Sequence, residues 1–304
     1  MSELAVSVVV PVRNGRGHLE KLILALEAQT LGRDQFEVIV ADDGSTDGST
    51  DGLETLDGWL RVLWGPPRNA YAARNRAARA AQAPALAFCD ADCQPEPDWL
   101  EAGLQALERA EVAAGLIRFI VPKRRTIWTL IDIDTTKDHE REVQIGNAET
   151  ANLFVHRDFF DRLDGFDESS NDYGDFDFAL RSVRGGGRLV FAPEAAVWHP
   201  TRNTPRPFLR MVWNSHRSYA AREARNGGRP LGLRLRWWVP VLPHVHWRKQ
   251  SGRSLGLDRH WLTQNGVSPR LWDDLRALPL MYLLMPYLAG VAQLRGWLDG
   301  RRLR

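Results

Sequence analysis

Two aspartates one residue apart, Asp90 and Asp92, follow a short apolar run in the stretch "LAFCDADCQPEPDWL" (86–100). If residues 86–89 form a buried β-strand, the alternation of side chains places both carboxylates on the same face. Two negative charges so close repel each other unless a cation joins them, and a divalent cation with oxygen ligands is the natural candidate. The alternative is an ordinary loop pair that caps a helix opening near Pro97.

Strand-like and helix-like segments alternate on either side of this stretch. Four β-branched or apolar runs are predicted strands, and two segments with helical spacing of apolar residues separate them. This order predicts an α/β fold with a mostly parallel sheet covered by helices. The predicted strands are 6–12, 36–44, 61–64 and 85–89, and the predicted helices are 18–29 and 70–82.

Polar residues stand where three of these strands end. Asn14 follows the first strand, Asp42 and Asp43 follow the second, and Asp90 follows the fourth. Ligands of open α/β sheets bind at the carboxyl ends of the strands, so these side chains are expected to converge. A Gly-x-Gly-x-x-Gly motif and a phosphate-binding lysine loop are both missing from the sequence, which argues against the usual dinucleotide and P-loop sites.

The charge distribution divides the chain in two. Residues 1–199 hold 21 Lys and Arg against 33 Asp and Glu, whereas residues 200–304 hold 19 against 5. Such an asymmetry predicts a polyanionic partner for the basic part, either nucleic acid or an anionic membrane. We therefore expect a catalytic domain over 1–200 and a basic, Trp-rich, mainly helical extension over 201–304.

The N-terminus and the cysteines indicate the compartment. The chain opens on a strand-like run and lacks the basic, apolar and small-residue blocks of a secretory signal. Its two cysteines, Cys89 and Cys93, flank the aspartate pair, which excludes a disulfide framework. Both features predict a cytoplasmic protein.

Seven motifs stand in order over about 1–200: "VVVPVRN", "VADDGSTDGS", "RNAYAARNRA", "FCDADC", "ETANLFVHRDFFDRLDGFDE", "YGDFDFALR" and "VWHP". Each is weak alone, because a run such as "ADDGSTD" also forms ordinary turns. Their combination and order are specific. Together they resemble the motifs of glycosyltransferase family 2, whose members have the GT-A fold.

The resemblance implies a site for a nucleoside-diphosphate sugar, with UDP expected as the nucleotide. Asp42 or Asp43 would accept a hydrogen bond from the base, and Asn14 lies beside them. Arg74 would contact base or phosphate, with Asn75 orienting its guanidinium. Asp90 would face the ribose. The competing interpretation of Arg74 is an exposed helical arginine.

The resemblance also implies a metal and a general base. Asp92 and His199 would bind Mn²⁺ or Mg²⁺, which neutralises the departing diphosphate. Asp175 would remove the proton from an acceptor hydroxyl, with inversion at the sugar carbon. Asn152 and Asp177 would line the acceptor side. Acidic residues at a helix start are also favoured by the helix dipole alone, which is the competing interpretation of Asp175 and Asp177.

Two positions depart from the family pattern. Tyr71 stands where the family commonly has glycine, and Gly174 replaces the first acid of an acidic pair. Two other functions remain open at this point. A sugar nucleotidylyltransferase would bind a triphosphate next to "PVRNGRGH", and a non-catalytic nucleotide-sugar-binding protein would keep the fold without the chemistry.

The basic extension predicts contact with the inner face of the cell membrane. Residues 234–249 interleave Arg and Lys with three tryptophans, and residues 277–294 carry no charge but contain Pro279 and Pro286. A lipid-linked or cell-envelope carbohydrate acceptor would suit such a location. A packed helical layer or a homodimer interface would use the same residues. We expect no nucleic-acid partner, because the glycosyltransferase interpretation gives it no role.

Overall fold

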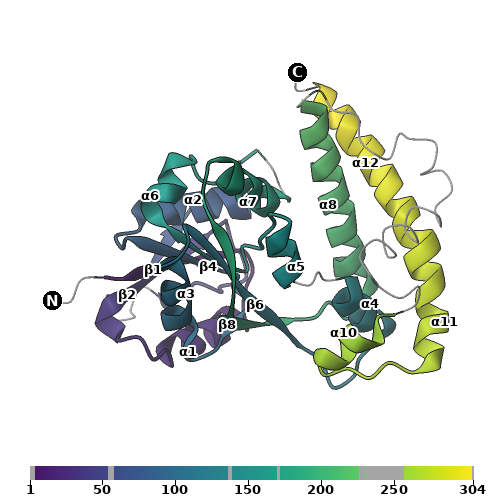
Figure 1. Ribbon diagram of the computed structural model, residues 1–304, viewed down its shortest axis with the longest axis horizontal. Coiled ribbons are helices and arrows are strands. Elements are labelled where there is room, and N and C mark those ends of the chain that lie inside the picture. The colour runs from purple at the N-terminus through teal and green to yellow at the C-terminus, as the bar shows by residue number, and fades with distance from the viewer. Residues whose placement is uncertain are drawn as a thin grey trace. The chain divides into compact units, whose positions relative to one another are not determined.

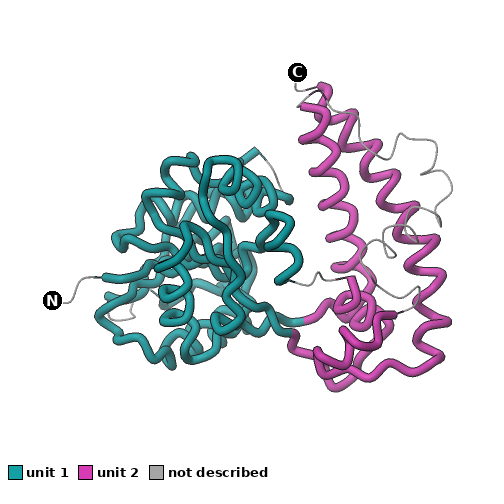
Figure 2. Tube along the Cα trace, viewed as in Figure 1, with its two compact units in different colours: residues 1–118, 138–200 teal, residues 119–137, 201–304 magenta. Residues whose placement is uncertain are grey.

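The computed structural model describes residues 4–53, 58–135, 139–169, 172–225, 227 and 257–302. The chain divides into two compact units, shown in Figure 2. Unit 1 comprises residues 1–118 and 138–200, and unit 2 comprises residues 119–137 and 201–304. A single division after residue 200 therefore differs from the structure in one respect, because 119–137 groups with the C-terminal part.

Unit 1 is built on a sheet of eight strands in the order β3-β2-β1-β4-β7-β6-β8-β5. Figure 1 shows this sheet with helices packed around it. β1 lies between β2 and β4 and is parallel to both, and β2 is parallel to β3. β7 is antiparallel to β4 and β6, and β5 is antiparallel to β8. The strands are β1 (Val6–Val12), β2 (Phe36–Asp42), β3 (Leu60–Trp64), β4 (Ala85–Cys89), β5 (Gln94–Pro95), β6 (Val112–Ile120), β7 (Asn152–His156) and β8 (Leu189–Pro200).

Helices cover both faces of this sheet, which confirms the predicted α/β class. α1 and α3 contribute to the apolar cluster on one face, and α2, α6 and α7 to the cluster on the other. The helices of unit 1 are α1 (Leu19–Glu27), α2 (Ala70–Ala80), α3 (Trp99–Leu107), α5 (His139–Gln144), α6 (Arg157–Arg162) and α7 (Gly174–Arg184), with a short 3₁₀ turn η1 (Arg33–Gln35).

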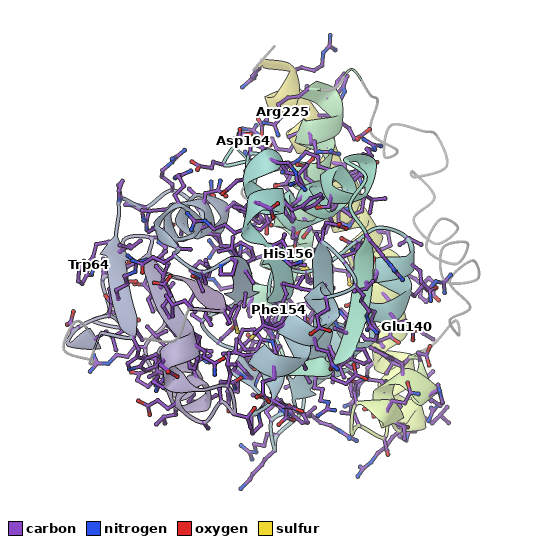
Figure 3. All side chains as sticks on the ribbon, turned by 60° about the vertical axis from the view of Figure 1, so that its left-hand side comes forward. Trp64, Glu140, Phe154, His156, Asp164 and Arg225 are labelled. Carbon is purple, nitrogen blue, oxygen red and sulfur yellow. The ribbon has the colours of Figure 1, made fainter. Side chains whose placement is uncertain are left out.

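The central strands read as continuous apolar runs because both of their faces are buried. Along β1, Val8 and Val10 belong to the first cluster, whereas Val9 belongs to the second. Phe154 of β7, labelled in Figure 3, packs its ring 5.0 Å from that of Trp99. Burial on both faces fixes the register of the strands, and the strand ends thereby acquire fixed positions.

Unit 2 is helical, with its own apolar cluster that includes Leu130 and Ile131 of α4, Phe208 of α8 and Met281. Gly296 and Gly300 of α12 lie against the backbone of α8, where a Cβ atom would meet carbonyl oxygens. The helices are α4 (Ile127–Thr135), α8 (Pro205–Arg225), α10 (Arg259–Gln264), α11 (Leu271–Pro279), the π-helical turn η5 (Leu280–Leu284) and α12 (Met285–Arg302). The Trp-rich segment 234–249 lies outside the described residues.

Candidate active site

The chain turns sharply between Asp90 and Cys93, directly after β4. The N–H of Cys93 donates to the carbonyl oxygen of Asp90 at 3.0 Å, so the strand does not continue past Cys89. The alternation of a strand therefore does not extend to Asp92. The two carboxylates were predicted to lie on one face of a strand. In the structure Asp90 and Asp92 have different partners.

Asp92 lies beside His199, with its Oδ1 atom 3.5 Å from the imidazole Nε2. The short ladder between β5 and β8 produces this pairing, because Gln94 lies opposite Trp198. The carboxylate is 38% exposed and the imidazole 17% exposed. An oxygen and a nitrogen ligand, both open to an incoming group, thus meet at the end of the sheet.

Cys93 completes a group of three possible ligand atoms that lie within 4.8 Å of one another. Its thiol is buried and donates to the carbonyl oxygen of Ala151 at 3.7 Å. Hydrogen bonding with Cys89 and burial raise the pKa of Cys93, so the thiol stays neutral. The carboxylate and the imidazole are the donors that fit a cation such as Mn²⁺, which favours oxygen and nitrogen ligands.

Asp90 pairs with Arg74 of α2. The guanidinium Nη2 lies 2.5 Å from Asp90 Oδ1, and the Arg74 side chain is only 5% exposed whereas that of Asp90 is 32% exposed. The Cζ atom of the Arg74 guanidinium lies 5.4 Å from the centroid of the Tyr71 ring. Arg74 is therefore a buried cation in the site, which contradicts the interpretation as an exposed helical arginine.

Tyr71 in turn meets Asp175 at the start of α7. The tyrosine hydroxyl donates to Asp175 Oδ1 at 3.3 Å, and the backbone N–H of Phe176 donates to the same oxygen at 2.8 Å. A Cβ atom on Gly174 would lie 2.8 Å from the Tyr71 ring. The two positions that depart from the family pattern are thus in contact with each other.

Asp42 and Asp43, both buried at the end of β2, hold different groups. Ser45 N–H donates to Asp42 Oδ1 at 2.7 Å, and the Thr50 hydroxyl donates to Asp42 Oδ2 at 2.8 Å. Asp43 Oδ1 accepts from the N–H of Arg68 at 2.8 Å. No other described side chain or backbone group donates to the Asp43 carboxylate, which therefore keeps more of its hydrogen-bonding capacity than the Asp42 carboxylate does.

Asn14 connects the loops that follow β1 and β2. Its Oδ1 atom accepts from Thr46 N–H at 2.8 Å, and its own N–H donates to the Ser45 hydroxyl oxygen at 3.0 Å. Its φ of 56° lies in the left-handed region, which asparagine tolerates better than most residues. Asn14 therefore shapes the rim of the site; contact with a nucleotide stays a prediction.

Asn75 holds the loop that follows α6. Its Oδ1 atom accepts from the N–H of Phe166 at 3.0 Å, and its Nδ2 atom donates to Phe166 O at 2.8 Å and to Glu168 Oε1 at 3.1 Å. These bonds join the motifs "RNAYAARNRA" and "GFDE". They give Asn75 a role in shaping the site, different from the predicted orientation of Arg74.

Asn152 is buried within the fold. It is 1% exposed, and its amide is bound on both sides. Trp99 Nε1 donates to Oδ1 at 2.8 Å, and Nδ2 donates to the carbonyl oxygens of Leu116 and Ala195 at 2.9 and 2.8 Å. An acceptor contact by Asn152 stays a prediction that this burial does not favour.

Asp177 is also used within the fold. Its Oδ2 atom accepts from Arg181 Nε at 2.7 Å, and Arg181 donates to the carbonyl oxygens of Leu163 and Gly165 at 2.5 and 2.6 Å. The ion pair thereby ties α7 to the loop after α6. An acceptor contact by Asp177 stays a prediction that this arrangement does not favour.

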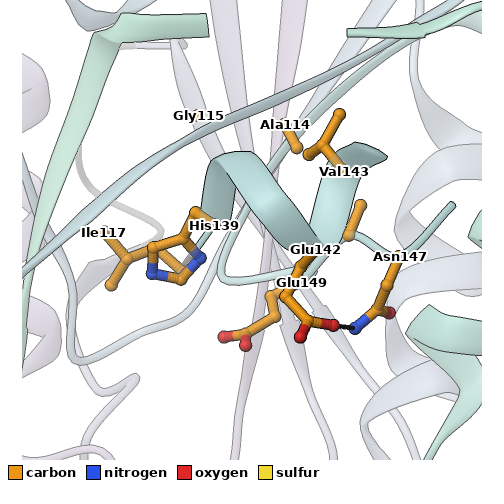
Figure 4. A pocket seen from close by; sticks show the side chains of 9 residues that line it. Ala114, Gly115, Ile117, His139, Glu142, Val143, Asn147 and Glu149 are labelled. Atoms are coloured by element: carbon orange, nitrogen blue, oxygen red, sulfur yellow. Dashed lines mark hydrogen bonds between the residues drawn. The ribbon is translucent and has the colours of Figure 1, made fainter. Parts of the chain in front are cut away.

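Sequence reasoning missed a small pocket between β6, α5 and the loop before β7, shown in Figure 4. Three titratable side chains line it: His139, Glu142 and Glu149. The Nε2 atom of buried His139 has no hydrogen-bond partner among the described residues. The sequence held no signal for this pocket, because its members come together only when α5 packs beside β6.

The family comparison covers most of the chain. The model of "Glycosyl transferase family 2" matches residues 7–164, and that of "Glycosyl transferase family group 2" matches residues 86–294. Glycosyltransferase AglE of Haloferax volcanii is 30% identical over 204 residues, which cover 65% of this chain and 67% of AglE. Of seven other curated glycosyltransferases, the chain spans between 23% and 53% of their length.

Solved structures give the same fold. The mannosyltransferase PcManGT from Pyrobaculum calidifontis, in complex with GDP-Man and Mn²⁺, has a TM-score of 0.61 at 18% identity, covering 99% of this chain and 88% of that one. S. aureus TarS 1–349, in complex with UDP-GlcNAc, has a TM-score of 0.55 at 14% identity, covering 98% and 91%. The fold is GT-A, and the chain belongs to glycosyltransferase family 2.

Proposed function

We propose that this glycosyltransferase is metal-dependent and inverting, and that it moves a sugar from a UDP-sugar to a hydroxyl acceptor. The observation that carries the proposal is the meeting of Asp92 and His199, 3.5 Å apart, directly after the strand that also positions Asp90. These groups are oxygen and nitrogen ligands at the end of a sheet where a donor diphosphate would bind. Their partial exposure leaves room for that ligand.

Asp92 and His199 would hold Mn²⁺ or Mg²⁺. When bound, the metal supplies positive charge that stabilises the departing diphosphate. Two neighbouring structures support the cation, since PcManGT and GalNAc-T7 were both solved with Mn²⁺. Cys93, the third group within 4.8 Å, is a soft sulfur ligand that Mn²⁺ and Mg²⁺ favour less than oxygen.

The donor would be held by the residues around the ends of β1, β2 and β4. Asp43 would accept from the base, because the carboxylate of Asp42 is already bound twice within its own loop. Asp90 would face the ribose, and Arg74 would set a positive potential beside the phosphates. UDP is favoured over GDP by analogy with the TarS complexes with UDP and UDP-GlcNAc, and PcManGT, which binds GDP-Man, marks the alternative.

Asp175 would act as the general base. It would take the proton of the acceptor hydroxyl while that oxygen forms a bond to the anomeric carbon. The bond from the same carbon to the diphosphate breaks on the opposite face, and the nucleoside diphosphate leaves with the electron pair. The product is a glycoside of inverted configuration.

A lipid-linked or cell-envelope acceptor at the inner face of the membrane would suit unit 2. The elements α11, η5 and α12 together form a continuous helical segment, Leu271–Arg302. By length and composition alone this segment could cross a membrane, and less than half of its most apolar stretch is buried. Large apolar side chains stand exposed along it at helical spacing. They include Trp272, Leu275, Leu283, Tyr287, Leu294 and Leu298. Arg301 and Arg302 close the helix with positive charge, which favours anionic lipid.

A donor screen tests the proposed reaction. The protein is incubated with UDP-glucose, UDP-GlcNAc and GDP-mannose, each with Mn²⁺, and the products are separated by chromatography. We expect one UDP-sugar to release UDP and sugar, with water as the slow acceptor. Formation of a UDP-sugar from UTP and a sugar phosphate, with release of pyrophosphate, would instead indicate a nucleotidylyltransferase. Binding of a donor without any turnover would indicate a non-catalytic protein.

A further inference from the structure

We propose that Tyr71 is a positioning residue for Asp175, and that Gly174 is small because the Tyr71 ring occupies the space beside it. The inference deepens the proposed function and rests on Asp175 being the base. It assigns a role to the two positions at which the chain departs from its family pattern.

The hydroxyl of Tyr71 is held in a fixed place. The residue is 6% exposed, and its ring packs 5.6 Å from that of Phe166, which Asn75 ties to α2 through two hydrogen bonds. Burial and the nearby charge of Asp175 raise the pKa of Tyr71, so its hydroxyl remains a donor. A buried ring with a protonated hydroxyl directs one hydrogen bond along one line, here to Asp175 Oδ1 at 3.3 Å.

The carboxylate of Asp175 receives two donors on the same oxygen. Besides Tyr71, the N–H of Phe176 donates to Oδ1 at 2.8 Å. One donor comes from α7 itself, and the other comes from α2 across the site. Such a pair restricts the rotation of the carboxylate, and a general base must be held within hydrogen-bond reach of the proton that it removes.

Gly174 permits this arrangement. It is the first residue of α7, and a Cβ atom built on it would lie 2.8 Å from three atoms of the Tyr71 ring. Any other residue at 174 would have to displace the ring, because aromatic carbons do not approach a Cβ so closely. A large residue at 71 therefore requires the smallest residue at 174.

The same ring connects the base to the donor side. The guanidinium of Arg74 lies 5.4 Å from the Tyr71 ring centroid and pairs with Asp90 at 2.5 Å. Tyr71 thus stands between a carboxylate assigned to the donor and a carboxylate assigned to the acceptor. A shift of the Tyr71 ring would therefore disturb both the Arg74–Asp90 pair and the Asp175 carboxylate.

A double-mutant cycle tests the proposal with the full chain. The four proteins are the unaltered enzyme, Tyr71→Phe, Asp175→Asn and the double variant, assayed for hydrolysis of whichever donor in the screen turns over fastest. Tyr71→Phe should lower kcat by about tenfold at an unchanged KM for the donor, in line with a hydrogen bond to a charged group. In the Asp175→Asn background the same change should alter kcat by less than about twofold, because the two groups act as one unit.

Tyr219→Phe is the matched control, because it removes the same hydroxyl from a half-buried ring on α8 of unit 2, to which no part in donor binding or catalysis is assigned. It should leave kcat unaltered, and thermal unfolding should show all five proteins folded. If Asp175→Asn abolishes turnover while Tyr71→Phe keeps full kcat, the inference is wrong and the proposed base stands. If Asp175→Asn itself keeps full turnover, both the assignment of Asp175 as the base and the positioning role of Tyr71 are wrong.

Discussion

Arg74 and Asp90 form an ion pair in which the cation is buried and the anion faces solvent. Their charged atoms lie 2.5 Å apart, with the Arg74 side chain 5% exposed and that of Asp90 32% exposed. Loss of the carboxylate and loss of the guanidinium should therefore have unequal effects on stability. A carboxylate left alone here can be hydrated, whereas a guanidinium left alone remains buried without its counter-charge.

Asp90→Ala should consequently destabilise the fold more than Arg74→Met does. We expect a loss of about 2 to 3 kcal/mol in unfolding free energy for Asp90→Ala, below the full cost of breaking a buried pair because Asp90 is partly hydrated. Arg74→Met should cost less, since it removes the buried charge together with the pair. Urea denaturation of the variants measures the difference, and an equal or reversed order would contradict this account of the pair.

Asp175→Asn should mainly lower activity, whereas Asp177→Asn should mainly lower stability. Asp175→Asn should lower transfer by about 10²-fold or more while donor affinity is retained, as expected for loss of a general base. Asp177→Asn should mainly lower stability, because Asp177 holds Arg181 at 2.7 Å and through it the loop after α6. Rate and unfolding measurements on both variants check this. A fully active Asp175→Asn beside an inactive Asp177→Asn would assign the base to the other residue.

The alternation of apolar runs was sufficient to predict the parallel half of the sheet, β1 to β4. It did not predict the other half, where β7 is antiparallel to β4 and β6 and β5 is antiparallel to β8, so the sheet is mixed rather than mostly parallel. The predicted strands and helices through residue 89 correspond to β1 to β4 with α1 and α2 between them, because buried parallel strands and amphipathic helices have distinct periodicities. The grouping of 119–137 with unit 2 was not predictable. It depends on α4 burying Leu130 and Ile131 among distant residues such as Met281, and a local pattern holds no record of such contacts.

The site was predictable by residue type and less so by role. Asp92 and His199 meet because β5 pairs with β8, and Asp90 after β4 meets Arg74 of α2. Asn152 shows the limit of this reasoning. Its motif marks it as notable, but only the packed structure shows that both of its N–H donors bind carbonyl groups and that its oxygen accepts from Trp99.

His216 should make the stability of unit 2 depend on pH. Gln293 Nε2 lies 3.1 Å from His216 Nδ1, and although part of the residue reaches solvent, burial lowers the pKa of His216 from 6.5 to about 4. The folded state therefore keeps the imidazole neutral between these values, whereas the unfolded chain binds a proton. Stability is fully present above pH 6.5 and falls toward pH 4, by at most about 1.4 kcal/mol per pH unit.

His216→Asn, which cannot titrate in this range, should flatten that dependence. Unfolding midpoints of the two proteins measured from pH 7 to pH 4 give the comparison. Parallel curves for the histidine and asparagine proteins would show that the imidazole does not carry the effect.

The exposed apolar side chains of α11 and α12 should bind the protein to anionic membranes. Replacing Trp272, Tyr287 and Leu294 by serine should reduce flotation with vesicles of phosphatidylglycerol and phosphatidylcholine, because membrane affinity scales with buried apolar area. The matched control replaces three exposed apolar residues of unit 1, Leu24, Trp64 and Ile145, and should float as the unaltered protein does. Failure of the unaltered protein to float at low salt would leave a helix-packing or dimer role for this face.

The proposed metal site at Asp92 and His199 predicts that donor hydrolysis requires a divalent cation. UDP release is measured for the unaltered protein, Asp92→Ala and His199→Ala after treatment with EDTA and then with increasing Mn²⁺. The account predicts that EDTA lowers the rate of the unaltered protein by about 10²-fold or more and that Mn²⁺ restores it, since the metal stabilises the leaving diphosphate. Asp92→Ala should stay inactive at every Mn²⁺ concentration, although its unfolding without metal should resemble that of the unaltered protein because its side chain is 38% exposed. Full turnover in excess EDTA, or an Asp92→Ala protein as active as the unaltered one, would contradict the account.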